Sequence, residues 1–375
     1  MKIRIEVSSL ATPSISGVGH YVRLLSEALS KHSDIEARGV YFNFLGRQVA
    51  PVIKMTPPPQ ANKLIPLRVY AKLQSYGLAL PFDLFMPKVD VTIFPNFATW
   101  PTVNSKLRAT TIHDLTYIRY PEAVEEKNLA HLRRVVPRSI KEADIILTVS
   151  EAVKNELVEE FSIDPARCVA TPIPPDETFF VKSSVDVHTK YNLPTKKYIY
   201  FIGNREPRKN LPVLIEAYSA LPQALKDEYS LVIAGGKGWK AEATNSAIEK
   251  AQAADDHVVP IGYIDQVDSP ALFQKASLFV MPSLYEGFGM PILEAMAGSC
   301  PVVAADVPVL REAGGEAALY ADPRSPQAFT TAIISVLTSQ DISKELAKKG
   351  SANLQRFSWQ VNAEAIHSKV KELLP

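Results

Sequence analysis

The sequence predicts an α/β protein with two domains, each built on a parallel sheet covered by helices. Short apolar segments rich in valine and isoleucine alternate along the chain with amphipathic helical segments, and this alternation is typical of doubly wound parallel sheets. A chain of 375 residues is also long enough for two hydrophobic cores. Almost equal numbers of basic and acidic residues, 41 and 40, argue against a nucleic-acid partner.

Nine segments are predicted to be strands because each is short, apolar and followed by a turn or a helical pattern. In chain order they are Lys2–Val7, Val91–Pro95, Ala109–His113, Ile145–Val149, Tyr198–Gly203, Leu231–Gly235, Val258–Gly262, Leu278–Met281 and Val302–Ala304. A proline-rich stretch after the fourth strand suggests a boundary. We predict a first domain over residues 1–175, a linker over 176–195 and a second domain over 196–357. Residues 358–375 are predicted to form a helix. It could pack on either domain, and packing on the first would require the chain to cross back to it.

The composition also bounds the cellular setting. The two cysteines, Cys168 and Cys300, are far apart and have no metal-ligand spacing, so we expect a reducing compartment. The first residues alternate charged and apolar side chains like a strand, unlike a secretory signal, and no apolar run is long enough to span a bilayer. The expectation is a cytoplasmic protein.

A turn with two glycines, Gly17 and Gly19, follows the first predicted strand and opens an amphipathic helix. Such glycines let the backbone approach a bound phosphate or sugar, although a tight turn that needs glycine for steric reasons is an equal alternative. Val22 stands where a dinucleotide-binding turn would carry its third glycine. A nicotinamide-dependent oxidoreductase is therefore a poor candidate.

Basic residues follow the strand that opens the second half of the chain. Asn204 comes directly after the glycine that ends the strand, and Arg208 and Lys209 come next before a helical run. Ligands of open α/β sheets bind at the carboxyl ends of strands, where these cations could clamp a diphosphate. A solvated basic turn is the alternative interpretation.

The segment from Pro282 to Ala297 is the most informative part of the sequence. After an apolar strand, a loop with Glu286, Gly287, Phe288 and Gly289 leads to Met290 and a helix that carries Glu294. Free amides at residues 288–290 would face a diphosphate, while the two carboxylates could accept hydrogen bonds from hydroxyls. This combination suits a sugar nucleotide; glutamates placed for the helix dipole are the structural alternative.

Glu286 and Glu294, separated by seven residues, resemble the E-x7-E signature of retaining glycosyltransferases of family four, which have the GT-B fold. The resemblance extends over nearly the whole chain. It is carried by Gly17-Val18-Gly19, Ile112-His113-Asp114-Leu115, Thr148-Val149-Ser150-Glu151, Pro207-Arg208-Lys209-Asn210, Ala234-Gly235-Gly236-Lys237-Gly238-Trp239, Gly314-Gly315-Glu316-Ala317-Ala318 and Phe357-Ser358-Trp359. The series looks most like that of bacterial polysaccharide mannosyltransferases.

The resemblance implies two Rossmann-like domains facing a central cleft, with the nucleotide held by the second and the acceptor by the first. Glu286 would then hold donor-sugar hydroxyls and Glu294 the ribose hydroxyls. Lys209, assisted by Arg208, would neutralise the diphosphate, and Gly17 and Gly19 would let the first domain close on it. His113 would lie against the donor sugar.

One position departs from the family pattern, because many relatives have an arginine where this chain has Asn204. Arg205 and Arg208 are both candidates for the missing cation.

The implied reaction transfers a hexose with retention of configuration to a hydroxyl of a glycan or lipid-linked acceptor. GDP-mannose is the leading donor, and UDP-glucose or a related UDP-sugar is the alternative. No Asp-x-Asp motif occurs in the sequence, so we expect neither a metal nor another cofactor. A non-catalytic GT-B subunit that binds a nucleotide sugar without turnover is the rival from another class.

Residues 37–82 contain no acidic residue but six basic ones, interleaved with apolar side chains: Arg38, Arg47, Lys54, Lys63, Arg68 and Lys72. We hypothesise that this segment contacts an anionic membrane surface or a lipid-diphosphate acceptor. A solvated insertion is the alternative.

Overall fold

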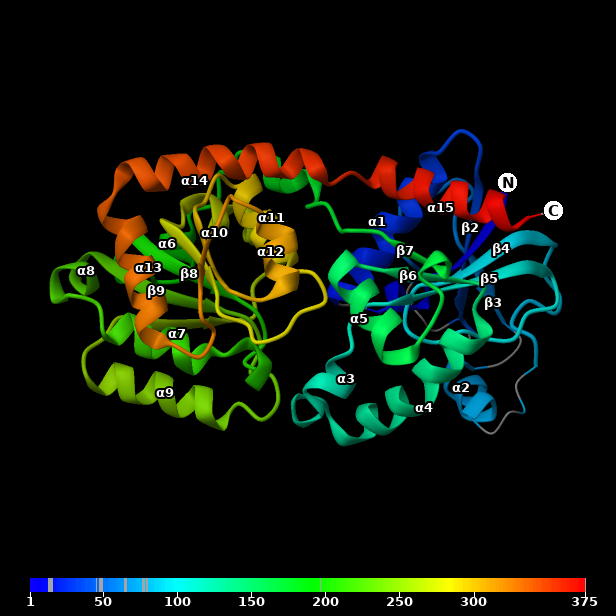
Figure 1. Cartoon of the computed structure of the whole chain (residues 1–375), viewed down its shortest axis with the longest axis horizontal. Coiled ribbons are helices and arrows are strands. Elements are labelled where there is room, and N and C mark those ends of the chain that lie inside the picture. The colour runs from blue at the N-terminus through cyan, green and yellow to red at the C-terminus, as the bar shows by residue number, and fades with distance from the viewer. Residues whose placement is uncertain are drawn as a thin grey trace. The chain divides into compact units, whose positions relative to one another are not determined.

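The chain folds into two units, each built on a parallel sheet (Figure 1). A computed structural model describes residues 1–12, 16–44, 46, 50–63, 66–75, 78, 80–195 and 197–374. The first unit contains residues 1–117, 126–173 and 358–375, and the second contains residues 118–125 and 174–357. Residues 118–125 thus group with the second unit although they fall inside the predicted first domain, and residues 176–195 are part of the second unit.

The first unit has a seven-stranded parallel sheet. Its strands, in spatial order, are β3 (Gln60–Asn62), β2 (Glu36–Phe42), β1 (Lys2–Glu6), β4 (Val89–Phe94), β5 (Ser105–Ile112), β6 (Ile145–Thr148) and β7 (Cys168–Ala170). β6 is buried at every position, as a parallel strand covered by helices must be, and this explains its almost continuous apolar sequence. β1 is buried from its second residue on, although charged residues alternate with isoleucines in its sequence.

The helices of the first unit are α1 (Gly17–Lys31), α2 (Leu67–Ser75), α3 (Thr116–Arg119), which ends in residues of the second unit, α4 (Glu126–Glu142), α5 (Glu151–Phe161) and α15 (Trp359–Leu373). α1 begins at Gly17 because the Ser16 hydroxyl accepts a hydrogen bond from the Gly19 amide. α15 packs on α1, and the Asn362 side chain donates to the Pro172 carbonyl at 2.7 Å. The final helix is therefore an integral part of the first unit.

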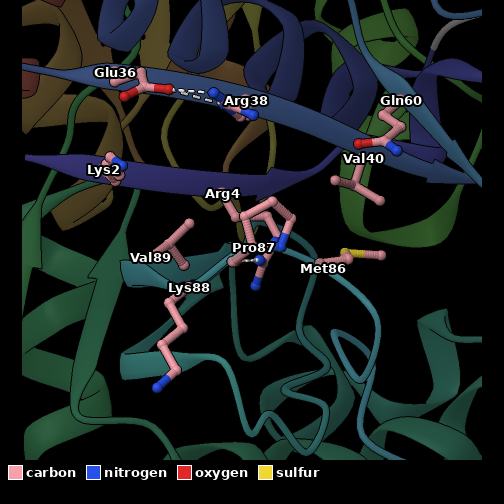
Figure 2. A pocket seen from close by; sticks show the side chains of 10 residues that line it. All are labelled: Lys2, Arg4, Glu36, Arg38, Val40, Gln60, Met86, Pro87, Lys88 and Val89. Atoms are coloured by element: carbon pink, nitrogen blue, oxygen red, sulfur yellow. Dashed lines mark hydrogen bonds and ion pairs between the residues drawn. The ribbon is translucent and has the colours of Figure 1, made fainter.

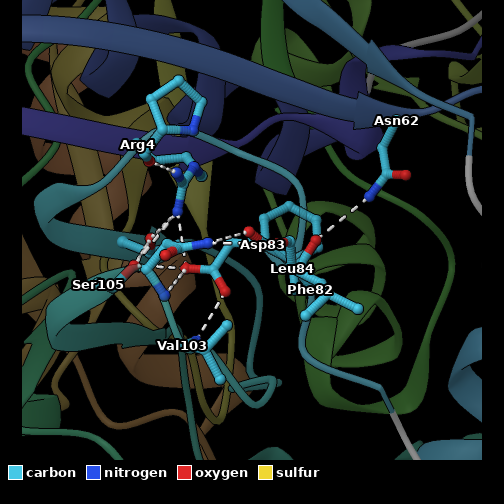
Figure 3. Close-up of polar contacts among 10 residues, drawn as sticks. Arg4, Asn62, Phe82, Asp83, Leu84, Val103 and Ser105 are labelled. Atoms are coloured by element: carbon cyan, nitrogen blue, oxygen red, sulfur yellow. Dashed lines mark hydrogen bonds and ion pairs between the residues drawn. The ribbon is translucent and has the colours of Figure 1, made fainter.

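A buried ion pair organises one face of the first sheet (Figure 3). The Arg4 guanidinium donates to the Asp83 carboxylate at 2.9 Å and to the hydroxyls of Thr92 and Ser105 at 3.2 Å. Asp83 also accepts the Val103 amide at 2.7 Å. Strands β1, β4 and β5 and the loop that carries Asp83 are therefore joined through one side-chain network.

The second unit has a six-stranded parallel sheet. Its strands, in spatial order, are β10 (Val258–Gly262), β9 (Tyr229–Ala234), β8 (Lys197–Ile202), β11 (Leu278–Met281), β12 (Val302–Ala305) and β13 (Leu319–Ala321). The helices are α6 (Val187–Lys190), α7 (Leu211–Ser219), α8 (Gln223–Glu228), α9 (Glu242–Ala253), α10 (Ser269–Lys275), α11 (Met290–Ala297), α12 (Pro308–Gly314), α13 (Pro326–Thr338) and α14 (Gln340–Asn353). The predicted fold class of two Rossmann-like domains is confirmed.

Each of the nine predicted strands coincides with an observed strand, whereas β2, β3, β7 and β13 were not predicted. β2 lies within the basic segment and pairs with both β1 and β3. Residues Glu36–Phe42 are therefore part of the sheet and not a solvated insertion. Arg47 lies outside the described residues. Among the described helices, none combines the length and the apolar character needed to cross a bilayer.

The buried pair predicts a strong asymmetry between two carboxylate substitutions on this sheet. Asp83→Ala leaves Arg4 charged and buried, so we expect a loss of about 3–5 kcal/mol in the free energy of unfolding. Glu36→Ala removes only an exposed partner of Arg38, so it should lower the free energy of unfolding far less than Asp83→Ala. Urea denaturation of both variants measures this, and similar losses in the two would contradict the structural role of Asp83.

Candidate functional site

In the second unit the order of the strands reverses at β8, whose neighbours are β9 on one side and β11 on the other. The loops that leave the carboxyl ends of β8 and β11 therefore meet, which is where open α/β sheets bind ligands. The Leu284 amide donates to the Arg208 carbonyl at 2.8 Å, and the Asn210 side chain donates to the Pro282 carbonyl at 3.0 Å. These bonds join the two loops.

Arg208, Lys209 and Glu286 form a cluster where the loops meet. The Lys209 ammonium lies 2.5 Å from one Glu286 carboxylate oxygen, and the Arg208 guanidinium lies 2.8 Å from the other. Arg208 also donates to Glu206 at 3.2 Å and to the Tyr285 carbonyl at 3.2 Å. In the sequence, Arg208 and Lys209 belong to one motif and Glu286 to another, and the structure brings the two motifs into direct contact.

The cluster is largely withdrawn from water, and this makes its charges interdependent. Side-chain exposure is 19% for Arg208, 12% for Lys209 and 9% for Glu286. Burial by itself would raise the pKa of Glu286, but Lys209 and Arg208 outweigh it and bring that pKa to about 2. Glu286 is therefore a carboxylate at neutral pH, and both cations are held in fixed positions.

The structure distinguishes the two candidate arginines. The Arg205 guanidinium donates to the Asn245 side chain on α9 at 3.1 Å, whereas Arg208 contacts Glu286. The Asn204 side chain is exposed and lies 3.4 Å from Glu206. Arg208 is thus the arginine that accompanies Lys209.

The loop after Glu286 turns sharply into α11. Gly289 is the N-cap of that helix with φ of +105°, and a Cβ there would lie 2.8 Å from Leu310. Phe288 is buried with its ring 5.6 Å from that of Phe357. In the described part of the chain, the amides of Phe288, Gly289 and Met290 have no protein acceptor, so they can donate to a ligand.

Glu294 lies on α11, one turn inside this helix start. Burial and, after it, the nearby negative charge of Asp176 together raise the pKa of its carboxyl to about 7. Among the described residues, no protein hydrogen bond reaches the Glu294 carboxylate. A half-buried acceptor without a partner is suited to bind a hydroxyl donor.

The remaining predicted residues lie in the first unit. Gly17 has open space around its Cα, so the fold itself does not require glycine there, whereas the Gly19 amide is used by Ser16. His113 is buried after β5; its Nε2 lies 2.8 Å from the Pro95 carbonyl, and its ring contacts Tyr21 and Phe97 at 5.0 and 5.3 Å. Burial lowers the pKa of His113, which favours a neutral imidazole.

Comparison with known proteins links the second unit to a known family. Residues 186–353 match the family described as Glycosyl transferases group 1. The matched range contains Arg208, Lys209, Glu286 and Glu294. These residues are thus part of a glycosyltransferase group 1 domain, and the chain is homologous to O-antigen mannosyltransferases.

Two curated relatives show similarity in sequence, and one solved structure shows similarity in fold. The O-antigen chain mannosyltransferase B of Escherichia coli is 33% identical over 254 residues, which cover 67% of this chain and 66% of that protein. The serotype-specific mannosyltransferase WbdA of Escherichia coli is 30% identical over 58% of this chain and 27% of its own length. The chain thus matches less than two thirds of either relative. Anabaena HepE in complex with UDP and glucose superposes with a TM-score of 0.70 over the full length of both chains, at 16% identity, and shares the GT-B fold.

Sequence reasoning missed the residues that hold the cluster in place. Asn210 adopts a left-handed conformation, φ +57°, and its side chain ties the Lys209 loop to the Pro282 and Pro323 carbonyls. The Glu206 carboxylate accepts a hydrogen bond from Arg208, and the charge of Asp176 contributes to the raised pKa of Glu294. Asparagine tolerates left-handed backbone, so its position before a helix was the available signal for the first of these.

The raised pKa of Glu294 predicts a pH-dependent stability. Ionisation of Glu294 costs more free energy in the folded than in the unfolded chain. The resulting loss of folding stability is absent below the ordinary pKa of 4.5, grows as the pH rises and is complete above about pH 7. We expect Glu294→Gln to match the wild type at pH 4.5 and to melt roughly 2 °C or more higher at pH 8. Thermal unfolding at both values tests this, and an equal difference at both would contradict it.

Proposed function

We propose that this chain is a retaining glycosyltransferase that moves mannose from GDP-mannose to a hydroxyl of a glycan or lipid-linked acceptor. The Arg208–Lys209–Glu286 cluster carries the proposal, because it places two fixed cations beside a carboxylate at a carboxyl-end switch point. The mannosyltransferase relatives support the choice of sugar. We further propose that the enzyme works in the cytoplasm.

In the proposed reaction the bond between the anomeric carbon and the leaving phosphate oxygen breaks while the acceptor oxygen bonds to that carbon on the same face. The acceptor proton passes to the leaving phosphate oxygen, so no side chain needs to be the nucleophile. Lys209 and Arg208 stabilise the negative charge on the departing diphosphate. Glu286 accepts hydrogen bonds from sugar hydroxyls, and Glu294 from the ribose.

The first unit contributes Gly17, Gly19 and His113 to the proposed mechanism. Gly17 lets the backbone approach the diphosphate, and His113 lies against the donor sugar. Because the Nε2 of His113 faces the Pro95 carbonyl and the ring is buried, we assign it a positioning role.

We also propose that turnover needs no divalent metal. The two cations and the amides of residues 288–290 supply the positive charge that a metal ion would otherwise bring to the diphosphate. This proposal concerns the transfer step alone.

A UDP-glucose-type donor is the alternative within the same fold, and HepE, solved with UDP and glucose, supports it at the level of fold. A subunit that binds nucleotide sugar without turnover is the second alternative. A thermal-shift panel of GDP, UDP, ADP and their sugar conjugates, with EDTA present, separates the donors because the bound base raises the melting temperature. NMR of the product formed with a lipid-linked acceptor then reports the anomeric configuration.

Lys209→Ala should lower kcat/KM about 100- to 1,000-fold, because one of the two cations on the leaving group is lost. Lys197→Ala is the matched control: Lys197 is an exposed lysine of the same unit, paired with Glu228, and its loss should change kcat/KM less than about twofold. Both are measured by nucleotide release. Wild-type rates for Lys209→Ala would contradict the proposed role, and nucleotide binding without turnover in the wild type would favour the non-catalytic alternative.

We propose in addition that the first unit contacts an anionic membrane. Large apolar side chains are exposed at Val69 on α2 and at Leu80, Leu84 and Phe85 in the following loop. These two segments are held together, because the Tyr70 hydroxyl of α2 donates to the Leu80 carbonyl at 2.8 Å. The surface therefore presents apolar groups from neighbouring segments.

Basic side chains line a pocket that also includes Met86 and Pro87, which directly follow Phe85 in the chain. Figure 2 shows a pocket on the first sheet lined by Lys2, Arg38 and Lys88, with Met86 and Pro87 from the loop after Phe85. Glu36 is the one acidic residue that lines it, and it is paired with Arg38. Apolar groups beside cations are suited to an anionic lipid surface, where each cation contributes about 1 kcal/mol.

Flotation with vesicles tests this contact. We expect recovery with vesicles containing anionic lipid and little with neutral vesicles. Phe85→Ser should reduce the recovery severalfold, while Tyr263→Ser, which alters an exposed aromatic ring of the second unit, should not. Equal recovery with both vesicle types would contradict the proposal.

A further inference from the structure

We propose that His32, Glu364 and His367 form a binding site for a divalent transition metal, with Zn²⁺ as the foremost candidate. The three side chains come from the end of α1 and from α15, and one possible ligand atom of each lies within 4.8 Å of the others. The His32 Nε2 lies 3.0 Å from one Glu364 oxygen, and the His367 Nδ1 lies 3.7 Å from the other. All three belong to the first unit.

The donor set has the chemistry that such a cation needs. Two imidazoles and one carboxylate are ordinary zinc ligands, and three protein ligands leave a position for water. A tetrahedral zinc site brings its ligand atoms to roughly 3.3 Å from one another, given bonds of about 2.0–2.1 Å. The 3.0 Å distance from His32 to Glu364 is slightly shorter than this, and the 3.7 Å distance from His367 to Glu364 is longer. Small torsional shifts are therefore needed, and Glu364, with 59% of its side chain exposed, has room to make them.

Two further observations point to a ligand at this position. The His367 Nδ1 is buried and, in the described part of the chain, has no hydrogen-bond partner, although its side chain is 14% exposed overall. His32 is the C-cap of α1, so the carbonyl end of that helix dipole faces the cluster and favours a positive charge. The Ser368 hydroxyl donates to Glu364 at 3.0 Å and orients its carboxylate.

The proton positions can accommodate the metal. The His32 Nδ1 now accepts the Asp34 amide at 3.2 Å, which places the imidazole proton on Nε2. A metal at Nε2 shifts that proton to Nδ1 and releases the Asp34 amide. The amide is exposed, so water can replace the lost acceptor at a small cost.

The site would fix α15, which begins where the chain returns from the second unit, to α1. It concerns the anchoring of a helix and is independent of the transfer reaction, which we propose to need no metal. The expected effect of the ion is therefore on stability, with the rate of sugar transfer unchanged at temperatures where the protein is folded.

The test uses the full chain without an affinity tag, stripped with EDTA and dialysed. We expect calorimetry to show that one equivalent of Zn²⁺ binds, and thermal unfolding to show that it raises the melting temperature. Co²⁺ bound in its place should give visible d–d absorption bands. His367→Ala should weaken Zn²⁺ binding at least about 100-fold, since losing even an outer-shell partner costs 10- to 100-fold. His131→Ala, which removes an exposed histidine of α4 outside the cluster, should leave binding unchanged.

Glu364→Gln guards against a folding defect, because its exposed side chain can change without disturbing the packing of α15. It should melt like the wild type in EDTA and lose the stabilisation by Zn²⁺. Absence of stoichiometric binding to the wild type would overturn the proposal. Equal affinities for wild type and His367→Ala, or an equal loss in His131→Ala, would overturn it as well.

Discussion

Glu286 is a carboxylate with little access to water, and it stays ionised because Lys209 and Arg208 compensate its charge. The two cations in turn have their positions fixed by that carboxylate. This mutual dependence joins two loops 77 residues apart in the chain, and it fixes the carboxyl-end surface of the second sheet. A ligand that enters the site meets charges already oriented, so less free energy is needed to organise them.

The strand reversal that produces this arrangement is a property of the whole sheet. β8 and β11 are neighbours in space but not in sequence. The loops that follow them therefore begin side by side at the carboxyl edge of the sheet. The order of the strands in the first sheet reverses in the same way at β1, which lies between β2 and β4. The turn with Gly17 follows β1, and Pro95, whose carbonyl contacts His113, follows β4. In each unit, candidate site residues or their direct contacts therefore lie in loops that follow the two strands at which the strand order reverses.

Much of the fold could be predicted from the sequence because several buried strands have almost continuous apolar sequences. Ile145–Thr148, for example, is buried at every position. The strands that were missed carry a weaker signal: β3 has three residues, and β2 alternates exposed and buried positions at its start and contains Gly39. Partial exposure interrupts the apolar run by which a buried parallel strand is recognised.

The candidate site was predictable at the level of its charged residues and glycines, since these lie in loops next to predicted strands. Which of its cations pairs with which carboxylate was not predictable. Whether Arg205 or Arg208 meets Glu286 depends on how the short turn before α7 ends at Asn210, and that is decided by bonds to distant carbonyls. His32 and Glu364 meet across 332 residues, so no local spacing could reveal their contact.

The chain passes between its two units four times, after residues 117, 125, 173 and 357. The first unit is therefore incomplete until residues 358–375 have been synthesised and α15 can pack on α1. During translation the second unit has all of its residues before the first does. The two units are accordingly completed in the reverse of the order in which their sheets occur in the sequence.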